Sequence, residues 1–295
     1  MPRSTPVEGF SLAYDRTGSG PPVLLLHGWP GDRGDYREMV PRLDGVEVVV
    51  PDLRGFGESD KHAVEPAEGY SAAAQGRSVV GLVEELGLGP VVLAGYDVGS
   101  RIAQHIARTT PEVVRALVLA PPLPGAGDRV LTPGALREFW YQAFHQLPLI
   151  EQMVDGRPDA VRAYLRHFWS HWSGPRYELP EADLDRLAGH YAEPGAFTAS
   201  IAWYRAGSGT VAMSLAETTP DPADRIRQPT TVLWPTDDPL FPPSWSDRLE
   251  HFFADVTVTT LDAGHFSPLE APTEFAAAIR ASVDATGRGR GTGVR

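Results

Sequence analysis

The residue with the clearest chemical potential is Asp97, at the centre of the segment Gly95–Tyr96–Asp97–Val98–Gly99. An apolar run over 90–94 precedes this segment, and a stretch with helical spacing over 100–108 follows it. Small residues two before and two after the central position, between a strand and a helix, are typical of a strained turn that lifts one side chain above a sheet. Serine is the usual occupant of such a turn, so an aspartate here changes the chemistry that we expect.

A carboxylate nucleophile favours a different substrate from a serine. It is already ionised at neutral pH, with an ordinary pKa near ~4, and needs no base for the first step. Attack on an ester carbonyl would form an anhydride, which lies uphill, whereas attack on an sp³ carbon with a leaving group forms a stable alkyl–enzyme ester. That ester must then be hydrolysed, and a histidine that activates water would do this.

Candidates for the histidine and its acidic partner follow later strands. Asp237 and Asp238 come directly after a strand expected over 230–234, and His265 follows a strand expected over 256–261. The order nucleophile, acid, histidine is the order found in hydrolases that use this turn. An aspartate at position 97 that only caps the following helix is the alternative, and the downstream acid and histidine argue against it.

The elements that must position these residues alternate between strand and helix. Strands are expected over 10–14, 23–26, 46–50, 90–94, 113–119, 230–234 and 256–261. Helices are expected over 35–43, 71–86, 100–108, 243–253 and 268–281. Such alternation predicts an α/β fold, with a mostly parallel sheet covered by helices on both faces.

The segment 122–225 has a different texture. It contains no clear strand and predicts short helices near 133–147, 158–170, 180–190 and 195–206, broken by proline and glycine. It also holds 13 of the 27 aromatic residues. We therefore expect a helical lid over an apolar cavity, although most of these aromatic side chains would serve only to pack the lid against the core.

Composition excludes several classes of protein. The chain of 295 residues has a net charge of -12, which disfavours a nucleic-acid partner. It has no cysteine, so disulfides and thiolate chemistry are excluded. The first residues form no apolar signal segment, and no stretch approaches the roughly 18 apolar residues of a spanning helix, so we expect no membrane association and a cytoplasmic location.

Five short motifs together resemble the α/β-hydrolase family over nearly the full length of the chain. They are His27–Pro30, Asp52–Ser59, Gly95–Gly99, Asp238–Pro242 and Ala263–Phe266. The resemblance implies a hydrolase core over 1–121 and 226–284, with a helical cap over 122–225 inserted after the sixth strand. We expect the tail over 285–295, rich in glycine and arginine, to be disordered.

The resemblance also implies roles within the site. The family places the acid four residues before a closing proline, here Pro242, which favours Asp238 over Asp237 as the partner that orients His265. Backbone N–H groups of Trp29 and Val98 would stabilise the oxyanion that forms on Asp97 when its ester is hydrolysed.

The cap motifs resemble epoxide hydrolases. The segments Phe139–Phe144 and Ile201–Arg205 are similar to their two lid motifs, each of which supplies a tyrosine that assists ring opening, here Tyr141 and Tyr204. The resemblance implies hydrolysis of a small-molecule epoxide to a vicinal diol without a metal or organic cofactor. The aromatic lid favours a bulky, apolar epoxide, and we expect a monomer or homodimer. The expected pocket residues are Trp29, Gln142, Trp203 and Phe266.

Two alternatives stay open at this point. A haloalkane or haloacid dehalogenase would use the same aspartate, but these enzymes usually carry Trp or Arg directly after the nucleophile, where this chain has Val98. Fluoroacetate dehalogenases also use a His-Trp pair in the lid. The second alternative is a ligand-binding protein without catalysis, because a fold alone proves no function.

Overall fold

Residues 2–288 are described by a computed structural model and form a seven-stranded sheet in the order β1-β3-β2-β4-β5-β6-β7. β1 pairs antiparallel with β3, and all other neighbouring strands are parallel. β2 and β4 are buried along their whole length, as expected of parallel strands covered on both faces. The strands are β1 (Tyr14–Gly18), β2 (Pro22–Leu26), β3 (Glu47–Pro51), β4 (Val91–Gly95), β5 (Val114–Leu119), β6 (Thr230–Pro235) and β7 (Val256–Leu261).

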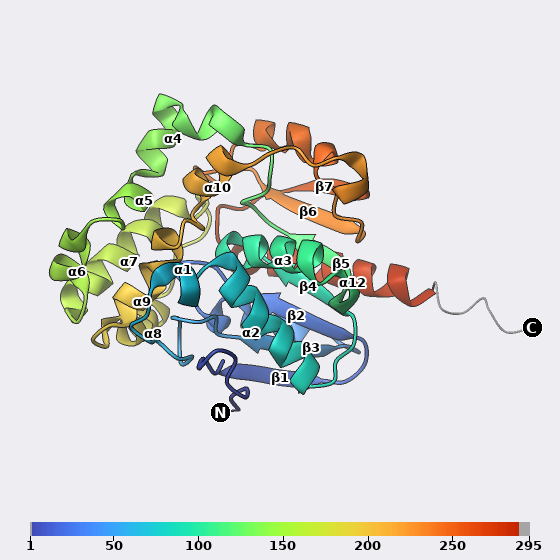
Figure 1. Cartoon of the computed structure of the whole chain (residues 1–295), viewed down its shortest axis with the longest axis horizontal. Helices are drawn as coiled ribbons and strands as arrows, with labels where there is room; N and C mark the ends of the chain where they lie inside the picture. The colour runs from blue at the N-terminus through green and yellow to red at the C-terminus, as the bar shows by residue number, and fades with distance from the viewer. Residues whose placement is uncertain (1, 289–295) are drawn as a thin grey trace, which may run out of the picture.

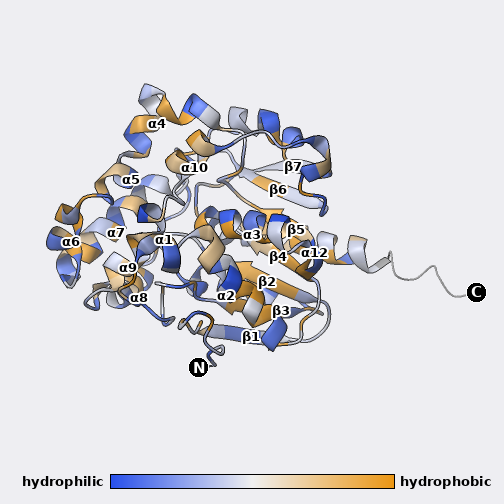
Figure 2. Cartoon of the chain, viewed as in Figure 1, coloured by the Kyte–Doolittle hydropathy of each residue, from blue (hydrophilic) through white to orange (hydrophobic). Residues whose placement is uncertain are grey.

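Helices cover both faces of this sheet. Figure 1 shows α2 (Ala72–Glu85) and α3 (Asp97–Thr109) in front of the strands and α12 (Pro272–Arg288) behind them. α3 contacts β2, β4 and β5, and α12 contacts β4, β5 and β6. The hydropathy colouring of Figure 2 places the most apolar residues in the central strands, between the two helical layers. The core of the protein therefore lies around β2, β4 and β5.

A helical insertion separates β5 from β6 and lies at one end of the sheet (Figure 1). Its seven α-helices are α4 (Pro133–Glu138), α5 (Trp140–Phe144), α6 (Pro148–Val154), α7 (Pro158–Trp172), α8 (Glu181–Ala192), α9 (Ala196–Arg205) and α10 (Thr210–Ala216). We call these helices with their connections the cap. Within residues 2–288, no helix is both long and apolar enough to cross a membrane.

The cap follows the fifth strand, so the predicted insertion after a sixth strand was wrong. The strand expected over 10–14 does not form, because residues before Tyr14 make only single bridges, Arg3 with Ala13 and Val7 with Phe10. Glu8, with φ 53°, and Gly9 turn the chain back on itself between the two residues of the second bridge, which prevents a longer ladder. The first strand of the sheet is therefore Tyr14–Gly18.

Several predicted helices take a different form. The helix expected over 35–43 is two short 3-10 helices, Arg33–Tyr36 and Val40–Arg42, and Pro243–His251 is also 3-10 rather than α-helical. The helix expected over 133–147 is broken at Phe139 into α4 and α5, and α6 and α10 were not predicted. α12 extends through residue 288, so 285–288 are helical and not disordered; the rest of the predicted tail, 289–295, lies outside the described residues.

Candidate active site

The turn at Asp97 has the strained geometry that the sequence predicted. β4 ends at Gly95, and Asp97 begins α3 with a φ of 47°, in the left-handed region that only a few non-glycine residues adopt. A Cβ atom on Gly95 would lie 2.7 Å from the carbonyl carbon of Gly99, and one on Gly99 would lie 2.0 Å from the carbonyl oxygen of Leu26. Close backbone packing therefore requires the two small residues, and the turn raises Asp97 above the sheet.

Backbone donors hold the Asp97 carboxylate. Oδ2 accepts a hydrogen bond of 2.7 Å from the N–H of Trp29, and the carboxylate also accepts one from the N–H of Val98. Burial raises the pKa of Asp97, while the charge of His265 and the two N–H donors oppose that rise. The carboxylate is thus desolvated, and one of its oxygens is engaged by the backbone.

Asp238 and His265 meet at the adjacent ends of β6 and β7. The two strands pair in register, so the segments that follow them emerge side by side. Asp238 Oδ2 lies 2.8 Å from His265 Nδ1, and Asp238 Oδ1 accepts from the N–H of Leu240 at 2.8 Å. Asp237 is exposed to solvent. The geometry therefore places Asp238, and not Asp237, in contact with the histidine.

The second ring nitrogen of His265 faces Asp97. Nε2 lies 3.8 Å from Asp97 Oδ1, too far for a direct hydrogen bond, and it has no other hydrogen-bond partner among the described residues. Burial alone would lower the pKa of His265, but the charges of Asp238 and Asp97 outweigh burial, so that the pKa is raised. The arrangement brings a carboxylate, a histidine and a second carboxylate into one buried line.

Two cap tyrosines lie above this line. The rings of Tyr141 on α5 and Tyr204 on α9 are 5.5 Å apart and nearly perpendicular, and their hydroxyl groups share a hydrogen bond. The Trp29 ring stacks on Tyr141 at 5.6 Å and meets Tyr204 edge-on at 5.8 Å. Burial raises the pKa of both tyrosines, and the charge of Asp97 adds to that rise. Both hydroxyls therefore stay protonated and lie within the field of Asp97.

The expected pocket residues occupy different places. Gln142 donates from Nε2 to the Tyr141 hydroxyl at 3.1 Å and accepts at Oε1 from the N–H of Val211 at 3.1 Å, so it ties the tyrosine to the start of α10. The Phe266 ring stacks on Trp169 at 3.6 Å. Trp203 is buried and takes part in none of the ring contacts described around Trp29 and the two tyrosines.

Two residues in the site were not singled out from the sequence. The centroid of the Trp172 ring lies 5.2 Å from that of His265 and 5.1 Å from that of Tyr141, so Trp172 packs against both rings. His145 is fully buried, 4.8 Å from the Tyr204 ring, and its Nε2 lies 3.0 Å from the Tyr164 hydroxyl. The only signal in the sequence was helical spacing, since His145 follows Tyr141 by one turn, and this is too common to identify a site.

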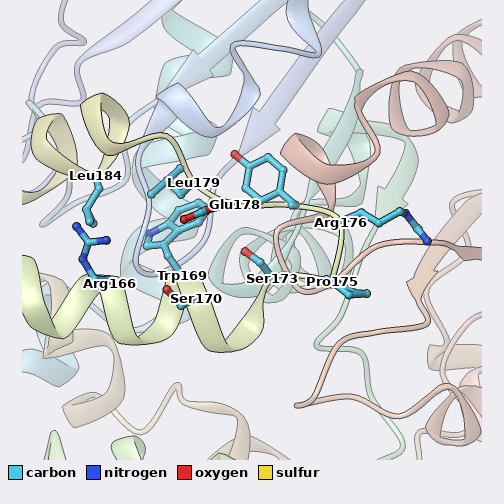
Figure 3. Close-up of a pocket in the computed structure, with 11 residues that line it drawn as sticks. Arg166, Trp169, Ser170, Ser173, Pro175, Arg176, Glu178, Leu179 and Leu184 are labelled. Atoms are coloured by element: carbon cyan, nitrogen blue, oxygen red, sulfur yellow. The ribbon is translucent and has the colours of Figure 1, made fainter.

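Two cavities in the cap lie near the site, and Asp97 lines neither of them. The cavity in Figure 3, about 490 Å³, is lined by Trp169, Ser173 and neighbouring residues between α7 and α8, and contains neither Asp97 nor a cap tyrosine of the site. A second cavity of about 460 Å³ between α5 and α10 is lined mainly by apolar side chains and includes Gln142 and Tyr204. Of these two cavities, the second adjoins the site.

The fold and this site define the class of protein. The family model for the α/β hydrolase fold matches residues 21–272, and the chain belongs to this family. The fold predicted from the sequence is thereby confirmed.

Particular relatives differ in what they catalyse. The chain is 28% identical to a soluble epoxide hydrolase of Corynebacterium sp. (strain C12) over 282 residues, which cover 90% of this chain and 91% of the relative. It is 30% identical to a fluoroacetate dehalogenase of Burkholderia sp. over 207 residues, 67% of this chain and 66% of the relative. An epoxide hydrolase of Bacillus megaterium, solved with an inhibitor, superposes with a TM-score of 0.79 at 22% identity, covering 95% of this chain and 99% of that chain. At this identity, the last similarity concerns the fold alone.

Proposed function

We propose that this protein hydrolyses epoxides to vicinal diols through a covalent ester on Asp97. The observation that carries the proposal is the pair of buried hydroxyls of Tyr141 and Tyr204, which come from two different cap helices and lie within the field of the Asp97 carboxylate. An epoxide oxygen leaves as an alkoxide and needs such donors, whereas a halide leaves as a weakly basic anion. The similarity to a soluble epoxide hydrolase, which covers 90% of this chain, supports the same reaction.

In the first step, Asp97 opens the ring. Oδ2 is engaged by the N–H of Trp29, so Oδ1 is the oxygen that is free to attack a ring carbon. A bond forms between Oδ1 and this carbon as the carbon–oxygen bond of the ring breaks. The developing alkoxide accepts hydrogen bonds from Tyr141 and Tyr204 and takes up a proton there, leaving a hydroxyl on the neighbouring carbon.

In the second step, His265 activates water. Its Nε2 takes a proton from a water molecule, and the resulting hydroxide attacks the ester carbon of Asp97. Asp238 holds Nδ1 at 2.8 Å and stabilises the charged imidazole. The negative charge that develops on Oδ2 meets the N–H groups of Trp29 and Val98. As this intermediate collapses, the bond between the Asp97 carboxyl carbon and Oδ1 breaks, and the departing diol oxygen takes the proton from His265. Asp97 keeps the oxygen of the water, and its carboxyl proton restores the tyrosine that was deprotonated in the first step.

The substrate is expected to be apolar. The site is enclosed by the rings of Trp29, Tyr141 and Trp172, and the adjoining cavity is lined mostly by apolar side chains. Aromatic and aliphatic walls bind apolar groups by burial and offer few partners to charged ones. We therefore expect styrene-type and bulky epoxides to react better than small polar ones.

Dehalogenation is the second candidate, because the chain is similar to a fluoroacetate dehalogenase over two thirds of its length. Asp97 and His265 would serve that reaction equally well. Val98, however, supplies no side-chain donor for a halide and no charge for a substrate carboxylate, and it is buried. Halide release measured on short haloalkanes and on haloacids separates the two activities from diol formation.

A panel of aliphatic, styrene-type and bulky epoxides assayed for diol tests the proposal directly. A single turnover in ¹⁸O-water should place the label in the Asp97 side chain, and label found only in the diol would exclude the ester. His265→Gln should trap the alkyl–enzyme, seen as a mass increase equal to the epoxide. If no substrate is turned over and no adduct forms, the protein is a binder on this fold and not an enzyme of this type.

A further inference from the structure

The carboxylate of Glu270 accepts hydrogen bonds from the backbone on both sides of His265. Glu270 Oε2 accepts hydrogen bonds from the N–H of Gly264 at 2.7 Å and of Gly174 at 2.8 Å, and Oε1 accepts from the N–H of Phe266 at 3.0 Å. Gly264 and Phe266 are the two neighbours of His265 in the chain. Glu270 thus fixes the backbone on both sides of the histidine, and its charge also helps to raise the pKa of His265.

The third donor belongs to the cap. Gly174 lies two residues beyond the end of α7, on the segment that Figure 3 shows leaving that helix past Ser173 and Pro175. The same contact includes a hydrogen bond of 2.8 Å from the N–H of His265 to the carbonyl of Trp172. A Cβ atom on Gly264 would lie 2.2 Å from the nitrogen of Gly174, so the two backbones meet directly. We call this contact of residues 172–174 with 264–265 the seam.

We propose that Glu270 is a positioning residue that sets His265 against Asp97 by binding the histidine loop and the cap at the seam. The proposal rests on the role of His265 proposed above. It goes beyond that role because Glu270 belongs neither to the line Asp97–His265–Asp238 nor to the tyrosine pair.

The chemistry of the three contacts explains why a carboxylate is needed. Each oxygen of an ionised carboxyl group accepts up to two hydrogen bonds, and hydrogen bonds to a charged acceptor are stronger than those to a neutral one. A glutamine has one acceptor oxygen, and its NH₂ group would face at least one of the N–H donors. Nε2 of His265 must place a water between itself and the ester carbon of Asp97, across the present 3.8 Å separation from Oδ1. A small displacement of the loop would spoil this distance.

The two half-reactions separate positioning from general structural damage. Ring opening depends on Asp97 and the tyrosines, whereas ester hydrolysis depends on His265. In Glu270→Ala we expect ester hydrolysis to slow roughly 100-fold, as misplacement of a reacting group by about 1 Å does. Glu270→Gln should have a smaller effect of the same kind. Rapid-quench mixing with a styrene-type epoxide, followed by intact-protein mass spectrometry, should show alkyl–enzyme accumulating in both variants while its formation stays near the wild-type rate.

Glu274→Gln is the matched control, because Glu274 lies exposed on α12 four residues further on. It should behave as wild type. Equal slowing of both half-reactions in the Glu270 variants would overturn the proposal, since a merely structural role reduces both together. Unchanged hydrolysis would overturn it as well.

A measurement without substrate keeps this test independent of the proposed reaction. The proton between His265 Nδ1 and Asp238 should give a low-field NMR signal, assigned by its loss in His265→Gln. We expect the signal to shift and to exchange faster with water in Glu270→Gln, but not in Glu274→Gln. If the wild type converts no epoxide while this signal still responds, the proposed function fails and the positioning role stands. A signal that does not move would overturn the positioning role.

Discussion

The core and the cap contribute to one site by different physical means. In the core, backbone groups hold the charged residues: Asp97 by the N–H groups of Trp29 and Val98, Asp238 by Leu240, and the His265 loop through Glu270. In the cap, packing dominates, because Tyr141 and Tyr204 lie among the rings of Trp29, Trp172 and His145.

This difference has a chemical reason. A buried charge is costly unless polar groups compensate it, and backbone N–H groups at strand ends and helix starts are fixed donors that do this without side-chain entropy. Neutral hydroxyls need only to be aimed, which stacked aromatic rings achieve. We therefore expect core substitutions to change charge and chemistry, and cap substitutions to change ring opening alone.

The largest effect is expected at Asp97, the proposed nucleophile in the core. Asp97→Asn should lower kcat by roughly 10⁴-fold or more, as removal of a member of a catalytic triad does. Because burial raises the pKa of Asp97, the folded state binds its proton more tightly than the unfolded state. Protonation of Asp97 therefore stabilises the folded state. This contribution is complete below the ordinary pKa of 3.8 and is lost as the pH rises through the raised pKa of the folded state. At neutral pH the charge opposes folding, so the variant should have a higher Tm.

Calorimetry at pH values near 7 and near 3 checks this prediction, because the gain in Tm should shrink at the acidic value. Asp237→Asn serves as the control, since the Asp237 side chain is exposed to solvent. It should keep wild-type activity. An inactive Asp97→Asn variant that is less stable than wild type at neutral pH would show that the backbone donors fully compensate the buried charge.

In the cap, the tyrosine hydroxyls are expected to matter less. Tyr141→Phe or Tyr204→Phe should each slow ring opening by roughly 10²-fold, the lower range for acid assistance. The double variant should fall by less than the product, because the two hydroxyls share a hydrogen bond and act as a pair. Hydrolysis of a preformed ester should be unaffected. Rapid-quench measurement of alkyl–enzyme formation gives both rates.

Tyr177→Phe is the matched control, as Tyr177 lies on the cap and lines the separate cavity of Figure 3. Slowing of ester hydrolysis by the tyrosine variants would contradict the expectation that cap substitutions change ring opening alone.

The same difference explains what the sequence could predict. Asp97 and His265 stand at fixed places after strands, so the pattern of strands and turns indicated both of them. That pattern left Asp237 and Asp238 open, and the choice of Asp238 came from the resemblance to the α/β-hydrolase family. The two tyrosines were found through short motifs. Trp172 and His145 were missed, because their importance comes from how rings of distant helices pack, and nothing in local spacing encodes that. The broken helix at Phe139 and the two additional cap helices were missed for a similar reason, since tertiary packing decides such short elements.

A smaller effect is expected where core and cap meet. In Gly264→Ala the new methyl group would lie 2.2 Å from the nitrogen of Gly174 and 2.5 Å from the carbonyl oxygen of Trp172. Neither backbone group can move alone, so the seam must widen, at a cost of about 1–3 kcal/mol in the free energy of unfolding.

Urea denaturation gives the free energy of unfolding. Gly189→Ala on α8 is the control, because a Cβ atom there meets nothing within 4 Å and alanine favours a helix. It should be neutral or stabilising. No loss of stability in Gly264→Ala would mean that the cap moves away from the histidine loop freely.

The last and smallest effect concerns the influence of the Asp97 charge on the pKa of His265. The charge of Asp97 helps to raise the pKa of His265 above its usual 6.5, together with Asp238. Formation of the ester neutralises Asp97 and removes that contribution, so the pKa of His265 should fall in the alkyl–enzyme, when the imidazole must act as a base. The rate of ester hydrolysis should decline about tenfold per pH unit only below this lowered value. The midpoint of this decline, measured in single turnovers, should therefore lie below the pKa of His265 that NMR gives for the free protein.

In Asp97→Asn, which mimics the neutral state of Asp97, the pKa of His265 measured by NMR should likewise be lower than in wild type. The pKa values of Tyr141 and Tyr204 are raised above 10.0, so these tyrosines should cause no further change in the pH profile of the rate below that pH. An NMR value in Asp97→Asn equal to or above that of wild type would show that the charge of Asp97 does not raise the pKa of the histidine.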